Sequence, residues 1–405
     1  AAEQKKTSAK DRIGKIVAEM EESAVIDAKL ESAAADVHSG AVRHLYVHIP
    51  FCARICPYCA FYKTRADPTQ TQRFCQALVR ELGDLRERFT IDVETIFFGG
   101  GTPTALTSDQ LDCVLRGFAD QLDLSSVAEW TIEANPGSVS ARKAKLLHER
   151  GITRVSLGVQ SWNDDLLGVL GREHSAKQAE ESFRIFRDAG HKNISIDLMF
   201  GLPGQTLAQW EATLARTVAL EPEHISAYCL TYEEDTEFLL RHQRGEYRQD
   251  DSSDARFFES AMRILEAAGY RQYEISNYAR PGFESVHNRG YWRGEDYLGI
   301  GPSAFSTVRL KRWQNVSDYL AYADRVLGGA SAVASTEPLT AEMKRAEQIA
   351  LLLRTREGVP RDWLEPWLNE RNEFMELGLM REEGERFLLT RKGKLLADSV
   401  AAEFV

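Results

Sequence analysis

Three closely spaced cysteines could hold a metal cluster. Cys52, Cys56 and Cys59 form a C-x3-C-x2-C pattern directly after the apolar run 45–49. Thiolates are the soft ligands that iron–sulfur clusters need, and a short loop lets three of them converge on one cluster. A four-iron cluster takes four ligands, so three cysteines leave one iron open to another ligand. The pattern therefore predicts an open four-iron cluster at the end of a strand.

The same cysteines leave a structural zinc site or free buried thiols open as alternatives. Zinc would need a fourth Cys or His at a finger-like spacing. Only His48, four residues before Cys52, is a conceivable fourth ligand. The remaining cysteines stand in apolar surroundings and are interpreted as core residues: Cys75, Cys113 and Cys229.

A second group of residues that could bind a ligand lies at the ends of predicted strands. The run Gly99-Gly100-Gly101-Thr102 follows an apolar stretch and would let the backbone approach a ligand closely, although a tight turn would use the same residues. It lacks the lysine of a phosphate-binding loop. Glu133 and Asp197 stand in apolar runs, where a carboxylate must be paired or bound to something polar. A salt bridge to a core arginine is the alternative for Glu133.

A third group is His287-Asn288-Arg289-Gly290-Tyr291-Trp292. One imidazole is enough to ligate heme iron, and two aromatic rings could flank a flat macrocycle. Taken alone, a histidine beside two aromatics is more often a hydrogen-bonded packing residue.

The elements that must position these residues alternate along the chain. Short apolar, β-branched runs predict strands at 45–49, 95–98, 130–134, 154–159, 194–200 and 224–228. The stretches between them predict helices at roughly 69–88, 108–121, 138–150, 163–189 (broken near Gly171) and 205–219. Strands joined by crossover helices imply an α/β fold with a parallel sheet, either doubly wound or a partial barrel.

Composition limits the function further. The 405 residues carry a net charge of −11, which disfavours a general nucleic-acid binder. No apolar run is long enough for a transmembrane helix, and no secretory signal is expected. Six cysteines in a chain of this length do not suggest a disulfide framework, so we expect a reducing cytoplasmic location.

With its motifs, the chain resembles radical S-adenosylmethionine (SAM) proteins. The marks are the cysteine spacing with Tyr58 before the last cysteine, and the stretches 46–52, 99–104 and 196–206. These stretches place it in the coproporphyrinogen-oxidase-like branch, where it is most similar to the HemW heme chaperones from about Leu45 onward. The resemblance implies a partial six-stranded (β/α)6 barrel and a 4Fe-4S cluster with SAM on the fourth iron.

The resemblance also implies a SAM site and a mechanism. An electron from the reduced cluster would cleave SAM. No catalytic residue is expected beyond the cluster, and whether the protein turns SAM over as an enzyme stays open. The expected SAM contacts are Tyr46, Tyr58, Gly100, Gly101, Thr102, Glu133, Gln160, Arg172 and Asp197.

The segment 287–292 resembles the H-N-x-x-Y-W motif of the heme chaperones. This resemblance favours heme binding by His287 over the interpretation of His287 as a packing residue. The implied heme candidates are His287, Asn288, Tyr291 and Trp292. Coproporphyrinogen dehydrogenases of this branch carry a further cysteine where this chain has Phe61. We therefore expect a protein that binds heme and transfers it to acceptor proteins. The alternative is an oxygen-independent coproporphyrinogen III dehydrogenase, or another radical SAM enzyme acting on a tetrapyrrole.

Two positions depart from the family pattern. Ala60 stands where the family usually has aspartate, and Phe305 replaces a histidine common in the heme chaperones. The expected partners are heme, heme acceptors and an electron donor for the cluster, and a homodimer is left open.

Four regions are predicted. Residues 1–41 form a polar extension, 42–235 the core barrel, 236–340 an accessory region with the H-N-x-x-Y-W motif, and 341–405 a winged-helix-like domain. The basic run 391–394 in the last region is interpreted as part of a packing domain, because the whole chain is acidic.

Overall fold

The structure, a computed structural model, describes residues 40–247 and 250–404. The predicted polar extension, 1–41, therefore lies outside the described residues except for its last two positions.

Six parallel strands form the centre of the sheet. They are β1 (Val42–Ile49), β2 (Ile91–Gly100), β3 (Glu129–Ala134), β4 (Arg154–Gln160), β5 (Ile194–Phe200) and β6 (His224–Cys229). All six predicted strands are confirmed, and they neighbour one another in chain order. A doubly wound sheet reverses its strand order at a switch point. Because this order does not reverse, the doubly wound alternative is wrong.

Helices connect the parallel strands. They are α2 (Pro68–Arg88), the 3-10 turn η1 (Pro103–Ala105), α3 (Ser108–Ala119), α4 (Ala141–Glu149), α5 (Asp164–Val169), α6 (Ala176–Asp188) and α7 (Leu207–Ala219). Asp67, Thr107, Ser140 and Ser175 cap helix starts, because each side chain accepts a free backbone N–H. The predicted break near Gly171 is confirmed: this residue has φ +66° and lies between α5 and α6.

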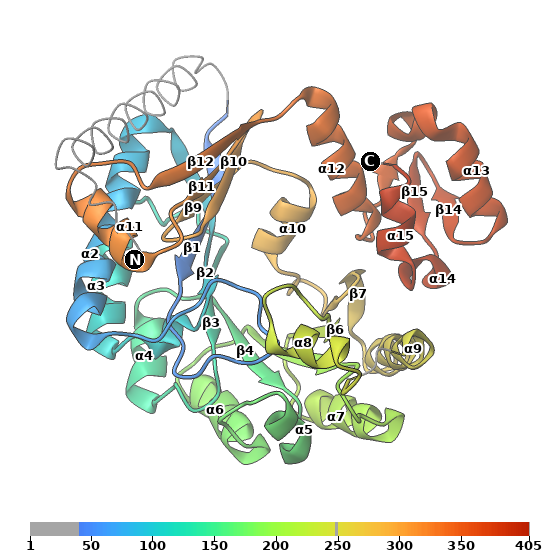
Figure 1. The fold of residues 1–405 in the computed structure, drawn as a ribbon, viewed down its shortest axis with the longest axis horizontal. Coiled ribbons are helices and arrows are strands. Elements are labelled where there is room, and N and C mark those ends of the chain that lie inside the picture. Colours follow the sequence, from blue (N-terminus) through green and yellow to red (C-terminus); the bar gives the residue numbers. More distant parts are fainter. Residues whose placement is uncertain (1–39, 248–249, 405) are drawn as a thin grey trace, which may run out of the picture.

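The two faces of the sheet differ in polarity. Leu45, Val47 and Ile49 of β1 are fully buried and belong to the main hydrophobic core. Their strand neighbours point to the opposite face, since side chains alternate along a strand. On β1 these neighbours are His44, Tyr46 and His48. In Figure 1 the strands follow a curved row, with the connecting helices on the outer side and α10 (Val286–Trp292) on the concave side.

Residues of the predicted accessory region extend the same sheet at both edges. On one side β9 (Tyr297–Ile300) pairs with β1 in parallel, followed by antiparallel β10 (Phe305–Val308), β11 (Lys311–Asn315) and β12 (Val333–Pro338). On the other side are β8 (Asn277–Ala279) and β7 (Arg271–Glu274). The helices of this region are α8 (Glu237–Gln243), α9 (Asp251–Ala267), α10 and α11 (Tyr319–Leu327).

The C-terminal residues form a separate small sheet with its own core. Its strands are β13 (Val359–Pro360), β14 (Met380–Glu383) and β15 (Arg386–Leu389), all antiparallel. Its helices are α12 (Ala341–Leu353), the 3-10 helix η2 (Arg361–Trp367), α13 (Leu368–Glu376), α14 (Arg391–Lys394) and α15 (Ala397–Ala402). Ile349, Leu353, Phe387 and Phe404 lie in its hydrophobic core. Across the described residues, no helix is long and apolar enough to span a membrane.

Candidate cofactor site

The cysteine loop leaves the carboxyl end of β1 and is closed at its base. Cys52 N–H donates to the Thr64 carbonyl at 2.9 Å, and Thr64 N–H donates to the Pro50 carbonyl at 2.8 Å. Cys52, Cys56 and Cys59 are unbridged and partly exposed within this loop. The predicted ligands are therefore presented together on a short loop whose two ends are fixed.

The environment of the thiols controls their ionisation. Burial raises the pKa of Cys52 and of Cys59. Thr102 Oγ1 lies 3.7 Å from Cys52 Sγ, and Arg172 Nη1 lies 3.6 Å from Cys56 Sγ. Iron binds the thiolate, so metal binding must displace protons from Cys52 and Cys59.

Among the residues that the structure describes, the zinc interpretation lacks a fourth ligand. His48 uses both ring nitrogens inside the protein: Nε2 donates to the Tyr62 carbonyl at 2.9 Å, and Nδ1 accepts from the Tyr46 hydroxyl at 3.0 Å. Within residues 40–247 and 250–404, no three His, Cys, Asp or Glu side chains converge on one ion. A four-iron cluster does not need that convergence, because each thiolate binds a different iron. The loop therefore fits a cluster better than zinc.

A cavity of about 570 Å³ opens beside the cysteine loop. Its lining includes Cys52, Cys56, Thr102, Asn135 and Arg172. Asn135 Nδ2 donates to Thr102 Oγ1 at 2.7 Å, and its Oδ1 accepts from Arg172 Nη2 at 2.5 Å. The structure thus joins the predicted residues Thr102 and Arg172 through Asn135. Asn135 was not among the predicted SAM contacts, although its position just after β3 was an available signal.

Two glycines let the strand end of β2 press against β1 and the cysteine loop. Gly100 has φ +106°, and a Cβ there would lie 2.5 Å from the His48 ring. A Cβ at Gly101 would lie 2.5 Å from the backbone carbon of Pro50. Any side chain at either position would displace the base of the cysteine loop.

The Glu133 carboxylate has one hydrogen-bond partner in the described part of the chain. Its Oε2 accepts from Gly100 N–H at 3.1 Å, and among the described residues it has no ion-pair partner. The predicted alternative, a salt bridge to a core arginine, is therefore wrong for the described part of the chain. Burial, and then the charge of Asp197, raise the pKa of Glu133 to about 8. An under-satisfied carboxylate of this kind fits a ligand that brings hydrogen-bond donors.

Gln160 and Asp197 are satisfied to different degrees. Asp197 accepts from Ser156 at 2.7 Å and from Ser195 at 2.8 Å, while burial raises its pKa. Gln160 has φ +66° at an irregularity of β4, and its Oε1 is buried without a hydrogen-bond partner in the described chain. A strained residue with an orphan acceptor is typical of a ligand-binding position.

The two predicted tyrosines lie in different surroundings. Tyr46 stacks on Phe97 of β2 with ring centres 6.2 Å apart. Tyr58 lies in the cysteine loop, and its ring lies 5.9 Å from that of Phe238 on α8. Burial raises the pKa of both phenols, so both hydroxyls stay protonated.

His287 lies at the other end of the sheet from the cysteine loop. It belongs to α10 and is 9% exposed, with Nδ1 2.8 Å from Thr95 Oγ1. Its ring stacks on Phe97 with ring centres 5.2 Å apart, and Phe97 also stacks on Tyr46. Burial, and then the nearby His44, lower the pKa of His287 to about 3, so its imidazole is neutral. The structure therefore does not bring the predicted heme residues onto the cysteine loop.

The other three residues of the motif differ in exposure. Tyr291 is 46% exposed, and its ring packs edge-on against Trp292 at 5.3 Å. The Trp292 ring also lies under the Arg354 guanidinium, and its Nε1 is buried without a partner in the described chain. Asn288 lies in the first turn of α10, where its N–H donates to Ser285 Oγ at 3.3 Å. Phe61 and Phe305 are exposed by 70% and 44%.

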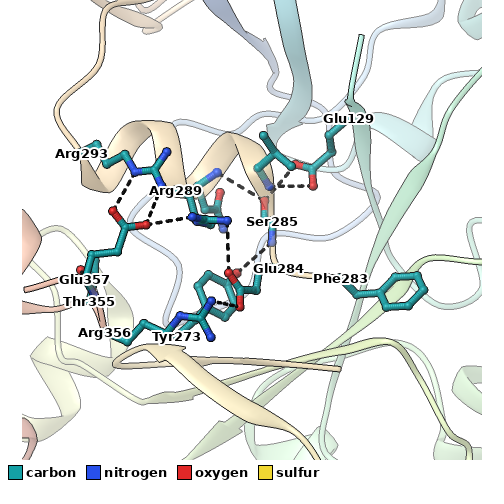
Figure 2. A network of polar contacts seen from close by, with 12 residues as sticks. Glu129, Tyr273, Phe283, Glu284, Ser285, Arg289, Arg293, Thr355, Arg356 and Glu357 are labelled. Carbon is teal, nitrogen blue, oxygen red and sulfur yellow. Dashed lines mark hydrogen bonds and ion pairs between the residues drawn. The ribbon is translucent and has the colours of Figure 1, made fainter. Parts of the chain in front are cut away.

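An ion-pair network that the sequence analysis missed ties α10 to the C-terminal unit (Figure 2). Glu357 accepts from Arg293 Nε at 2.8 Å and Nη2 at 2.6 Å, and from Arg289 Nη2 at 2.9 Å. Glu284 pairs with Arg289 at 3.3 Å and with Arg356 at 2.7 Å. The motif helix is thus clamped by the segment that follows α12.

The chain is similar to known proteins that belong to one superfamily. The model of the radical SAM superfamily matches residues 46–216. The heme chaperone HemW of Bacillus subtilis (strain 168) is 37% identical over 381 residues, covering 90% of this chain and 99% of that protein. The heme chaperone HemW of Escherichia coli (strain K12) is 38% identical over 266 residues, covering 65% of this chain and 70% of that protein.

A solved structure shares the fold. Coproporphyrinogen III oxidase (HemN) from Escherichia coli, a radical SAM enzyme, superimposes with a TM-score of 0.80 over 93% of each chain. The sequence identity is 22%, so this likeness shows the fold alone.

Proposed function

Because the chain belongs to the HemW heme chaperone family of the radical SAM superfamily, we propose that it binds heme and transfers it to acceptor proteins. One observation carries this proposal. The similarity to the Bacillus subtilis heme chaperone covers 90% of this chain, so it cannot be confined to the superfamily region at 46–216.

The proposal includes a 4Fe-4S cluster held by Cys52, Cys56 and Cys59, with SAM beside it. When bound, the cluster and SAM would supply one-electron reductive cleavage of a carbon–sulfur bond. The role of the protein is to hold the cluster and to orient SAM beside it. The under-satisfied acceptors on Glu133 and Gln160 would receive donors of the ligand, which fits SAM's hydroxyl and ammonium groups.

The other proposed SAM contacts would line the cavity and position SAM in it. Gly100 and Gly101 would bring backbone close to the ligand, and the Thr102–Asn135–Arg172 chain would fix one side of the cavity. Tyr46, Tyr58 and Asp197 complete the proposed set. An external electron donor would be needed to reduce the cluster.

For heme, we propose His287 as the iron ligand, with Asn288, Tyr291 and Trp292 shaping the site. A neutral imidazole is the form that binds iron, and the lowered pKa of His287 keeps it neutral. Tyr291 offers an exposed ring of the kind that could cover a flat macrocycle.

Coproporphyrinogen dehydrogenation is the second candidate, favoured by the fold shared with HemN. Phe61 argues against this candidate. Resemblance to the coproporphyrinogen dehydrogenases would imply a further cysteine at this position beside the cluster, but this chain has an exposed phenylalanine.

We extend the proposal to the architecture and the location. The in-order parallel strands and their polar concave face support a partial (β/α)6 barrel over 42–235. The β14–β15 hairpin beside helices supports a winged-helix-like unit within 341–405, with 236–340 as the accessory region. The six cysteines form no disulfide among the described residues, which suits the reducing cytoplasm.

The test is a transfer experiment. The anaerobically reconstituted protein is loaded with heme, freed of excess heme and mixed with an apo heme protein whose holo spectrum is distinct. A chaperone will convert the acceptor to its holo form and leave coproporphyrinogen unchanged in the presence of SAM and reductant. Decarboxylation of coproporphyrinogen without heme transfer would replace the proposal by the second candidate.

A further inference from the structure

One row of side chains crosses three parallel strands beneath the motif helix. His44 of β1 and Thr95 of β2 are register partners, and Thr95 is in turn the partner of Glu129 on β3. All three side chains are buried. The row therefore forms a fixed polar floor against which α10 is placed.

Glu129 holds the backbone of α10. Its carboxylate accepts from Ser285 Oγ at 2.9 Å, from Val286 N–H at 2.9 Å and from His287 N–H at 3.1 Å (Figure 2). These bonds fix the position of the first turn, and hence the Cα of His287, relative to β3.

Thr95 holds the side chain of His287. Thr95 Oγ1 lies 2.8 Å from His287 Nδ1 and also 2.8 Å from His44 Nδ1. His44 Nε2 lies 2.7 Å from Glu295 Oε2. A continuous hydrogen-bonded chain thus runs from the carboxylate of Glu295 to the ring of His287.

For neutral imidazoles, this chain permits one arrangement of protons. The hydrogen bond from His44 is the main cause that lowers the pKa of Glu295. The ionised Glu295 carboxylate can only accept a hydrogen bond, so His44 must carry its proton on Nε2. His44 Nδ1 is then an acceptor for the single hydroxyl proton of Thr95. Thr95 Oγ1 must in turn accept from His287, which places the His287 proton on Nδ1.

We propose that Glu295, His44 and Thr95 form a positioning relay that fixes His287 as its Nδ1–H tautomer and leaves the Nε2 lone pair free for heme iron. This inference rests on the proposed heme function. No described residue hydrogen-bonds His287 Nε2. Metal-binding histidines commonly donate their other N–H to a protein group, which fixes both the tautomer and the ring orientation.

The tautomer can be measured without heme. The full chain, labelled with 15N-histidine, is studied by NMR at pH 8, where ordinary imidazoles are neutral. The His287 signals are identified by their loss in His287→Gln. The relay predicts a protonated Nδ1 and an unprotonated Nε2 on His287. A proton on Nε2, or an equal mixture of tautomers, would overturn the relay whether or not heme binds.

Two variants at Thr95 separate the relay from simple packing. Thr95→Val keeps the shape and removes the hydroxyl, whereas Thr95→Ser keeps the hydroxyl. We expect Thr95→Val to weaken heme affinity about 10- to 100-fold and to change the Soret and EPR spectra of bound ferric heme. Thr95→Ser should restore both. Equal affinity and spectra for a folded Thr95→Val would refute the relay.

Discussion

The α-carbon of Gly290 lies directly against the imidazole of His44: a Cβ added there would be 2.5 Å from His44 Nε2. Only glycine therefore lets α10 lie this close to β1. Because the same helix carries His287 to Thr95, the Gly290–His44 contact sets the geometry on which the proposed heme site depends.

Replacing Gly290 with alanine should thus disturb the heme site. We expect Gly290→Ala to lower the free energy of unfolding by about 1–3 kcal/mol through overpacking, and to weaken heme affinity. Chemical denaturation and a heme titration measure the two effects. Gly168→Ala is the control, because Gly168 is an exposed helical glycine with open space around it. That change should stabilise the protein by up to about 1 kcal/mol. Unchanged stability and heme affinity in Gly290→Ala would show that the close contact is not needed.

The cluster prediction is tested by single cysteine replacements. Serine at Cys52, Cys56 or Cys59 should abolish most iron and acid-labile sulfide after anaerobic reconstitution, because each thiolate holds a different iron. Cys113→Ser, outside the loop, should retain both. Stoichiometric zinc in the anaerobically purified protein would instead favour the zinc alternative.

Glu133 should show opposite effects on stability and on ligand binding. Its folded pKa of about 8 lies above its unfolded value, so the folded state binds more protons between about pH 4.5 and 8. The contribution of Glu133 to stability is therefore full below about pH 4.5 and is lost as the pH rises to 8. We expect Glu133→Gln to gain in unfolding free energy relative to wild type across this window, by at least about 1 kcal/mol at pH 8.

Above about pH 8, where Glu133 is ionised, the same variant should bind SAM about tenfold more weakly or worse, because a charge-assisted acceptor is lost. Equilibrium dialysis of the reconstituted protein measures this. A stability difference that does not vary with pH, or unaltered SAM affinity, would contradict the role given to Glu133.

The Glu357 network should couple α10 to the C-terminal unit energetically. A double-mutant cycle between Glu357→Gln and Arg293→Gln is expected to give a coupling free energy of about 1 kcal/mol or more, since Arg293 donates two bonds to this carboxylate. The exposed pair Asp109–Arg142 is the matched control and should give less than about 0.5 kcal/mol. Equal coupling in both cycles would mean that the network is only a surface feature.

The sequence predicted the parts of the fold that leave a periodic pattern. Each of the six central strands and the break at Gly171 was found, because buried parallel strands are continuous apolar runs and glycine interrupts helices. The strands β9–β12 and the short strands β13 and β14 were missed. None is longer than six residues, and β12 and β14 are mostly exposed, so their local apolar pattern is weak.

The site was predictable where it lies in short motifs and unpredictable where it is built across the sheet. The cysteine loop and the glycine run are contiguous in sequence. Glu129 and His287 are 158 positions apart, and their contact exists only because β3 and α10 are brought together. Thr95 likewise carries no local mark of its role.

The most direct test of the heme assignment is a heme titration of the anaerobically reconstituted protein, followed in the Soret region, for wild type, His287→Ala and His191→Ala. His191 is a buried histidine elsewhere, bonded to the Ala144 carbonyl, and controls for loss of an imidazole. The account predicts saturation near one heme per chain in wild type and His191→Ala, and loss of the band in a folded His287→Ala. A wild type that gives no saturable band, or a His287→Ala that binds heme as wild type does, would contradict it.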